Sequence, residues 1–151
     1  QFWACVSSRS TSGTQLRLLL SEPQLGPAGG LLELLMGERE ARRPSSSLQA
    51  LAELESIWLS QEKERQRLLS CLEQCGWIVN QSSWQESLKL SVEPNLVERW
   101  LAEDRPYRRA LERSGEVGEH TLPELRQELL QQRGKHLPQS LRHWRIDGTL
   151  P

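Results

Sequence analysis

The sequence predicts an all-α domain: an irregular bundle of about five to seven helices, built around one long central helix that is coiled coil in part. Leucine dominates the apolar residues, and together with Gln, Glu and Arg it is typical of helices. Strands favour β-branched and aromatic residues, but Phe and Tyr occur once each and Val and Ile are sparse. The third observation is a seam of positions spaced by three and four residues through residues 45–76, which is typical of a helix that packs on helices.

We expect one helical domain flanked by two short segments. Residues 1–13 are predicted to be an N-terminal segment and linker, residues 14–145 the helical domain, and residues 146–151 a C-terminal tail. A chain of 151 residues is long enough to bury a sizeable core.

The first two helices are predicted on either side of a loop. Four leucines within residues 14–21 predict a short helix, and the Pro- and Gly-rich residues 22–30 predict a loop. Residues 31–43 predict a second helix. It would end at Arg42 and Arg43, because cations stabilise the last turn and Pro44 cannot continue it.

The central helix is predicted to run without a break from Ser45 to Gly76. Ser45, Ser46 and Ser47 are candidate N-caps, and Gly76 suits the left-handed residue that follows a helix. The seam is apolar at both ends but polar in its middle, at Gln61 and Arg65. Such a helix would be on the order of 45 Å long, so part of it is expected to project from the domain.

The second half of the chain is also predicted to be helical. Residues 83–90 predict a short helix, and Pro94 suits the first turn of another. Pro106 should interrupt that helix, since its ring crowds the residue before it. Thr121 and Glu124 form a capping-box pattern at the start of a further helix, and residues 137–142 resemble one more helix start.

Catalytic and cofactor motifs are missing from the sequence. It contains no nucleophile elbow, Walker loop, dinucleotide fingerprint or zinc-protease motif, so we expect neither an enzyme nor a bound cofactor. Cys71 and Cys75 lie four residues apart, but no second pair of ligands accompanies them, so we expect packing and not a metal site. Three cysteines make a poor disulfide framework, which indicates a reducing compartment.

The predicted function is protein–protein interaction. We expect an intracellular module, cytoplasmic or nuclear, that serves as a scaffold or as a subunit of a larger assembly and binds protein partners through helix packing. No apolar run is long enough to cross a membrane, so no membrane partner is expected. The candidate partner-binding residues lie along the seam: Leu51, Leu54, Trp58, Leu68 and Leu72.

A helical nucleic-acid-binding module is the alternative. Arginines can bind phosphates and a tryptophan can stack on a base. The candidate contacts are Arg105, Arg108, Arg109, Arg113, Arg142, Trp144 and Arg145. This alternative is the less favoured one, because acidic residues lie among these arginines and the net charge of the chain is −1.

Overall fold

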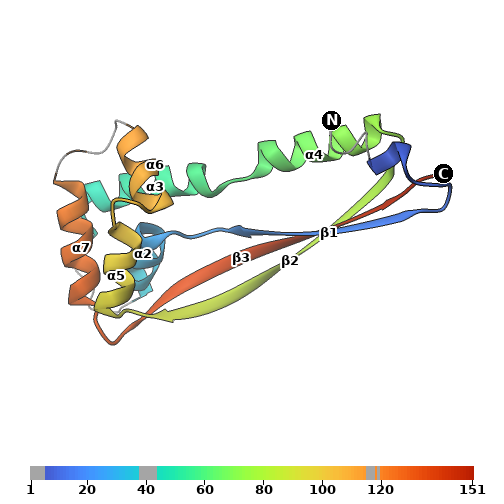
Figure 1. The fold of residues 1–151 in the computed structure, drawn as a ribbon. Helices are drawn as coiled ribbons and strands as arrows, with labels where there is room; N and C mark the ends of the chain where they lie inside the picture. The colour runs from blue at the N-terminus through green and yellow to red at the C-terminus, as the bar shows by residue number, and fades with distance from the viewer. Residues whose placement is uncertain (1–5, 38–43, 115–117, 119) are drawn as a thin grey trace. The chain divides into compact units, whose positions relative to one another are not determined.

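The structure is a computed structural model that describes residues 6–37, 44–114, 118 and 120–151. It is a mixed α/β fold, in which a three-stranded antiparallel sheet accompanies the helices (Figure 1). The predictions of an all-α bundle and of a coiled coil are therefore wrong. The strand order is β1-β3-β2, so the last strand of the sequence lies between the other two.

The elements alternate between strands and groups of helices along the chain. In sequence order they are β1 (Gln15–Pro23), α2 (Pro27–Gly37), α3 (Ser46–Leu59), α4 (Glu62–Gln74), β2 (Ile78–Ser91), α5 (Pro94–Leu101), α6 (Pro106–Ser114), α7 (Thr121–Gln131) and β3 (His136–Thr149).

All three strands occupy segments for which helices were predicted or no element was assigned. In β1, the half-buried Leu16, Leu18 and Leu20 alternate with the exposed Arg17 and Leu19, which is the two-residue period of a strand. Leucine favours helices only weakly, and pairing with β3 outweighs that preference. For the same reason the helices predicted at residues 83–90 and from residue 137 are replaced by β2 and β3.

The chain divides into two compact units, and each is described by itself. Unit 1 comprises residues 1–22, 60–86 and 141–151, and unit 2 comprises residues 23–59 and 87–140.

The predicted central helix is two helices. α3 ends at Leu59 and α4 begins at Glu62, so the seam is interrupted at Ser60 and Gln61, close to its polar middle. The predicted ends are confirmed: the backbone N–H of Leu48 donates to Ser45 Oγ at 3.2 Å, and Gly76 adopts a φ of +88°.

Proline places the boundaries of the later helices correctly. Pro94 lies in the first turn of α5, and the break predicted at Pro106 is confirmed because α5 ends at Leu101 and α6 begins at Pro106. The capping box at Thr121 is wrong: His120 is the N-cap residue and makes no side-chain capping hydrogen bond. Arg42 and Arg43 lie outside the described residues.

In unit 1, α4 covers one face of the sheet (Figure 1). Leu72 and Ile146 are fully buried, and the half-buried leucines of β1 pack against the same cluster. Trp77 follows Gly76 into this core, and its indole Nε1–H donates to Ser7 Oγ at 2.6 Å. The covered face therefore holds the hydrophobic core of unit 1.

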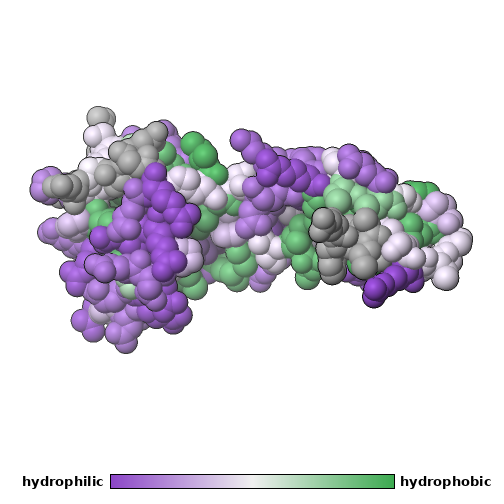
Figure 2. Space-filling view, turned by 45° about the horizontal axis from the view of Figure 1, so that its top comes forward, coloured by the Kyte–Doolittle hydropathy of each residue, from purple (hydrophilic) through white to green (hydrophobic). Residues whose placement is uncertain are grey.

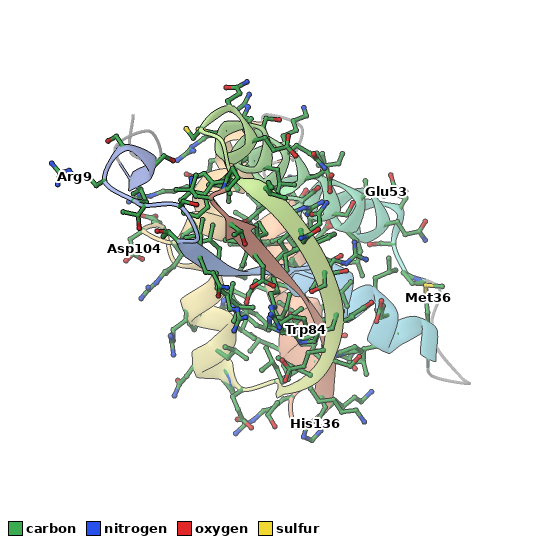
Figure 3. The ribbon with its side chains drawn as sticks, turned by 90° about the vertical axis from the view of Figure 1, so that its right-hand side faces the viewer. Arg9, Met36, Glu53, Trp84, Asp104 and His136 are labelled. Carbon is green, nitrogen blue, oxygen red and sulfur yellow. The ribbon has the colours of Figure 1, made fainter. Side chains whose placement is uncertain are left out.

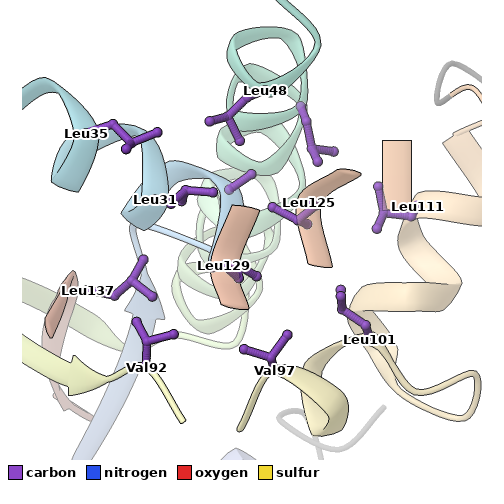
Figure 4. Packing of buried hydrophobic residues seen from close by; sticks show 12 residues of the cluster. Leu31, Leu35, Leu48, Val92, Val97, Leu101, Leu111, Leu125, Leu129 and Leu137 are labelled. Atoms are coloured by element: carbon purple, nitrogen blue, oxygen red, sulfur yellow. The ribbon is translucent and has the colours of Figure 1, made fainter. Parts of the chain in front are cut away.

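In unit 2, leucines and valines, most of them from the helices, converge on one cluster (Figure 4). Leu31 of α2, Leu51 of α3 and Leu129 of α7 are among its most buried members. α2 also approaches β3 closely: a Cβ atom at Gly30 would lie 2.8 Å from the backbone oxygen of Pro138. Glycine at this position allows the helix and the strand to touch.

Truncation of Leu72 should destabilise the chain. We expect Leu72→Ala to lower the free energy of unfolding by about 2–5 kcal/mol, because it leaves a cavity in a fully buried cluster. Leu19→Ala is the matched control, since Leu19 in the same unit is 63% exposed and its loss should change stability by less than about 0.5 kcal/mol. Urea denaturation measures both, and equal effects would contradict the assigned core.

Candidate interaction surfaces

An apolar groove in unit 2 is lined by the end of α3 together with α5 and α6. Its volume is about 440 Å³, which is within the range of ordinary binding pockets. The lining is mainly aromatic and aliphatic: Trp58, Leu59, Leu96, Trp100, Pro106, Tyr107 and Ala110, with the two cations Arg99 and Arg105. Hydrophilic residues dominate much of the surface seen in Figure 2, with hydrophobic residues in smaller areas between them.

The two cations give the groove a definite chemical preference. Arg99 is exposed, and the Arg105 side chain is half-exposed with its Nε 3.7 Å from an Asp104 carboxylate oxygen. A guanidinium at this exposure can still bind a carboxylate from a second molecule. The groove therefore suits apolar side chains that are accompanied by acidic residues.

A buried carboxylate fixes one wall of this groove. Glu55 of α3 accepts hydrogen bonds from the backbone N–H groups of Ala28 and Gly29, both at 2.7 Å, at the beginning of α2. The hydroxyl of Tyr107 donates to the same carboxylate. Burial raises the pKa of Glu55 above its usual 4.5, although these hydrogen bonds act in the opposite direction. Burial and the nearby Glu55 likewise raise the pKa of Tyr107.

In unit 1, the face of the sheet opposite α4 carries exposed side chains. Ser21 of β1 contacts His143 of β3, and Arg17 contacts Asp147, so the two strands have one consistent antiparallel register. β2 adds residues of the same face, including Trp84. We call this the open face.

A chain of polar contacts holds Trp84 in place on the open face. The Trp84 ring stacks on His143 with a centroid distance of 5.0 Å (Figure 3 labels Trp84). Nδ1 of His143 lies 2.9 Å from Ser21 Oγ, and Nε2 lies 3.0 Å from a Glu86 carboxylate oxygen. Hydroxyl, imidazole and carboxylate also follow one another in serine hydrolases. Here Trp84 covers the imidazole, whose side chain is 13% exposed, and we interpret the contacts as support for the indole.

The covered face of the same sheet contains a buried ion pair. Arg65 of α4 donates to Glu22 of β1 at 2.9 Å and also pairs with Glu62. Its guanidinium lies 3.5 Å from the ring centroid of Trp144, whose Nε1–H donates to Glu22 at 3.0 Å. One guanidinium therefore joins α4 to both β1 and β3.

The five residues predicted to bind a partner lie in different environments. Leu51 and Leu72 are buried in the cores of unit 2 and unit 1, so their area is used within the chain. Leu54, Trp58 and Leu68 are half-buried, and Trp58 lines the apolar groove.

Several of the predicted nucleic-acid contacts are engaged by other side chains of the chain. In α6, Arg108 pairs with Glu112 at 2.6 Å. Neighbouring strand residues point to opposite faces, so β3 separates Trp144 on the covered face from Arg145 on the open face. Arg145 pairs with Asp147 at 2.6 Å, and the guanidinium of Arg65 lies over the Trp144 ring on which a base would stack.

The remaining arginines predicted to contact nucleic acid are exposed to solvent. Arg105, Arg109 and Arg113 are exposed residues in or just before α6, and Arg142 is exposed on β3.

The sequence analysis missed the residues that organise both surfaces. Glu55 and Tyr107 meet in unit 2, and Ser21, Glu86 and His143 meet in unit 1, in each case from segments distant in sequence. No motif marks them. Ser21 and Glu86 were also assigned to helices, where their strand partners could not be anticipated. A Glu in the middle of an apolar helix stripe was the one available signal, and it pointed to Glu55.

No described helix is long and apolar enough to cross a membrane. Within the ranges given above, no three His, Cys, Asp or Glu side chains are grouped so that they could hold a metal ion. Cys71 on α4 and Cys75 just after it are half-buried free thiols.

No protein-family model matches the sequence, and no curated protein matches it significantly.

The raised pKa of Glu55 predicts a pH-dependent contribution to stability. The folded state binds this proton more tightly than the unfolded state, so the contribution is complete below about pH 4.5 and is lost as pH rises through the folded-state pKa. We expect the unfolding free energy, relative to Glu55→Gln, to fall by up to about 1.4 kcal/mol per pH unit in that window. Urea denaturation of both proteins between about pH 4 and 7 tests this. A difference that stays constant with pH would contradict it.

The Arg65–Glu22 pair predicts strong non-additivity. Arg65→Met or Glu22→Gln alone should lower the free energy of unfolding by about 1.5–3 kcal/mol, because each removes the charged hydrogen bond between two buried side chains, while Glu62 and Trp144 remain as partners. The double variant should lose less than the sum of the two single losses. A double-mutant cycle from denaturant unfolding gives the coupling energy, and purely additive losses would show that the pair is not coupled.

Proposed function

We propose that this chain is an intracellular protein–protein interaction module, a scaffold or a subunit of a larger assembly, and that the apolar groove of unit 2 binds the partner. The observation that supports the proposal is the concentration of Trp58, Trp100 and Tyr107 around a groove of about 440 Å³. Tryptophan and tyrosine contribute a large share of the binding energy at protein interfaces.

The groove is already organised for binding in the free chain. Trp58, Trp100 and Tyr107 pack with their inner parts against the core of unit 2, and Glu55 fixes the Tyr107 hydroxyl. Side chains that are held in place lose little conformational entropy on binding, so more of the contact energy appears as affinity. Free Cys71 and Cys75 support the assignment to a reducing compartment.

The partner that best fits the groove is an amphipathic helix with acidic residues beside its apolar stripe. Helices commonly bind apolar grooves through anchor residues spaced by three or four positions. Arg99 and Arg105 would receive the carboxylates of such a helix.

A display library of helical peptides tests the groove. Each member carries apolar anchors at helical spacing, with either acidic or basic residues beside them. We expect acidic members to be enriched, and Trp58→Ala to weaken their binding roughly 30-fold, as is typical of an interface hot spot. Ile57→Ala is the matched control, since Ile57 is 69% exposed in the same helix and is not among the residues that line the groove.

A second variant separates binding from folding. Because Trp58 also contacts the core, Trp58→Ala could act through stability. The single variant Arg99→Glu leaves the apolar lining intact and should shift the enrichment towards basic peptides. Equal binding of the peptides to both variants and to the native chain would refute the proposal that the groove is the binding site.

Salt distinguishes the nucleic-acid alternative, because phosphate-driven binding falls steeply as salt rises whereas apolar docking changes little.

A further inference from the structure

The outer edge of β2 has no strand partner among the described residues. β2 is an edge strand that pairs with β3 alone in the order β1-β3-β2. Its first part, Ile78–Trp84, belongs to unit 1 and is exposed or half-buried along its whole length. An edge of this kind offers a row of free backbone donors and acceptors to another strand.

The composition of this edge does not oppose pairing. Natural edge strands are usually protected by Lys, Pro, a bulge or a covering segment. Residues 78–84 contain no charged residue, no Pro and no Gly. Ile78 and Trp84 lie on the open face at the two ends of the stretch and are 60% and 48% exposed.

We propose that β2 pairs with β2 of a second copy of this chain, antiparallel and centred on Gln81. In this register Ile78 lies opposite Trp84 of the second copy, and Gln81 lies opposite its own equivalent. The same pair occurs twice about the two-fold axis, as an isologous dimer requires. Each exposed isoleucine would then be covered by an exposed tryptophan, an aromatic–β-branched pair that stabilises antiparallel strands.

The register follows from the pattern of side chains. Residues with even numbers point to the open face and those with odd numbers to the other face, so a two-fold axis perpendicular to the sheet keeps each face continuous. Centring on Gln81 is the arrangement that brings both exposed apolar residues of this stretch into contact. It also places only uncharged residues opposite one another over seven positions, so no like charges meet.

Trp84 is already positioned for this contact. Its ring stacks on His143, which Ser21 and Glu86 hold from both sides. The indole therefore needs little reordering when a second copy approaches. The paired stretch is short, so we expect a concentration-dependent dimer and not an obligate one.

Sedimentation equilibrium of the full chain tests the proposal. We expect the mass to rise from 17.4 kDa towards twice that value as concentration increases. Gln81→Lys and Gln81→Glu should each weaken the dimer about fivefold, because each sets like charges opposite one another at the axis. An equimolar mixture of the two variants should restore the dimer, since Lys then faces Glu.

Two controls separate this edge from general association. Leu19→Ala removes an equally exposed apolar side chain from the same face, but on β1, and should leave the dissociation constant unchanged. Trp84→Ala should weaken the dimer about tenfold, because both symmetric pairs lose their aromatic member. A chain that stays monomeric up to millimolar concentration would overturn the proposal. So would a dimer that mixing the charged variants fails to restore.

Discussion

The buried guanidinium of Arg65 determines how unit 1 is organised. A buried charge needs a partner charge and hydrogen bonds. The two terminal nitrogens of Arg65 pair with Glu22 and Glu62 and the guanidinium lies over the Trp144 ring, while its Nε has no hydrogen-bond partner among the described residues. These contacts hold α4 on one face of the three strands, so the opposite face and the β2 edge remain uncovered in this unit. The open face and the β2 edge of unit 1 are thus left uncovered because the Arg65 charge is buried on the other face.

In the described part of unit 2 the buried ionisable group is a single carboxylate, that of Glu55. Among the described residues, Glu55 accepts hydrogen bonds from backbone N–H groups at the positive end of α2 and from the Tyr107 hydroxyl, and none of these donors is a cation. The same atoms that satisfy the carboxylate hold the start of α2, the middle of α3 and one wall of the groove in register. A polar requirement of the core therefore shapes an apolar binding surface.

The sequence predicted local features far better than long-range ones. Pro94 and Pro106 restrict the backbone directly, Gly76 permits the positive φ that follows a helix, and the boundaries they indicated are found. The strands were missed because their residues carry no strong strand preference: β2 is rich in Ser and Gln, and β1 is a run of leucines. Their conformation is decided by pairing partners more than 100 residues apart for β1 and β3, which periodicity within a window cannot detect.

The candidate sites divide in the same way. Trp58 was identified because it lies on an apolar helical stripe, and it does line the groove. The contacts that position the groove and the open face join separate elements, and no local pattern contains them. The predicted contacts at residues 142–145 do not share one face, because a strand such as β3 sends neighbouring side chains to opposite sides.

The close approach of α2 to β3 makes Gly30 intolerant of amino-acid substitution. Every missense codon at Gly30 adds a Cβ atom, which would lie 2.8 Å from a backbone oxygen that cannot rotate away. At Gly37, seven residues further along the same helix, no described atom lies within 4 Å of such a carbon. Natural substitutions should therefore be rare at Gly30 and tolerated at Gly37, although the residue type and the helix are the same.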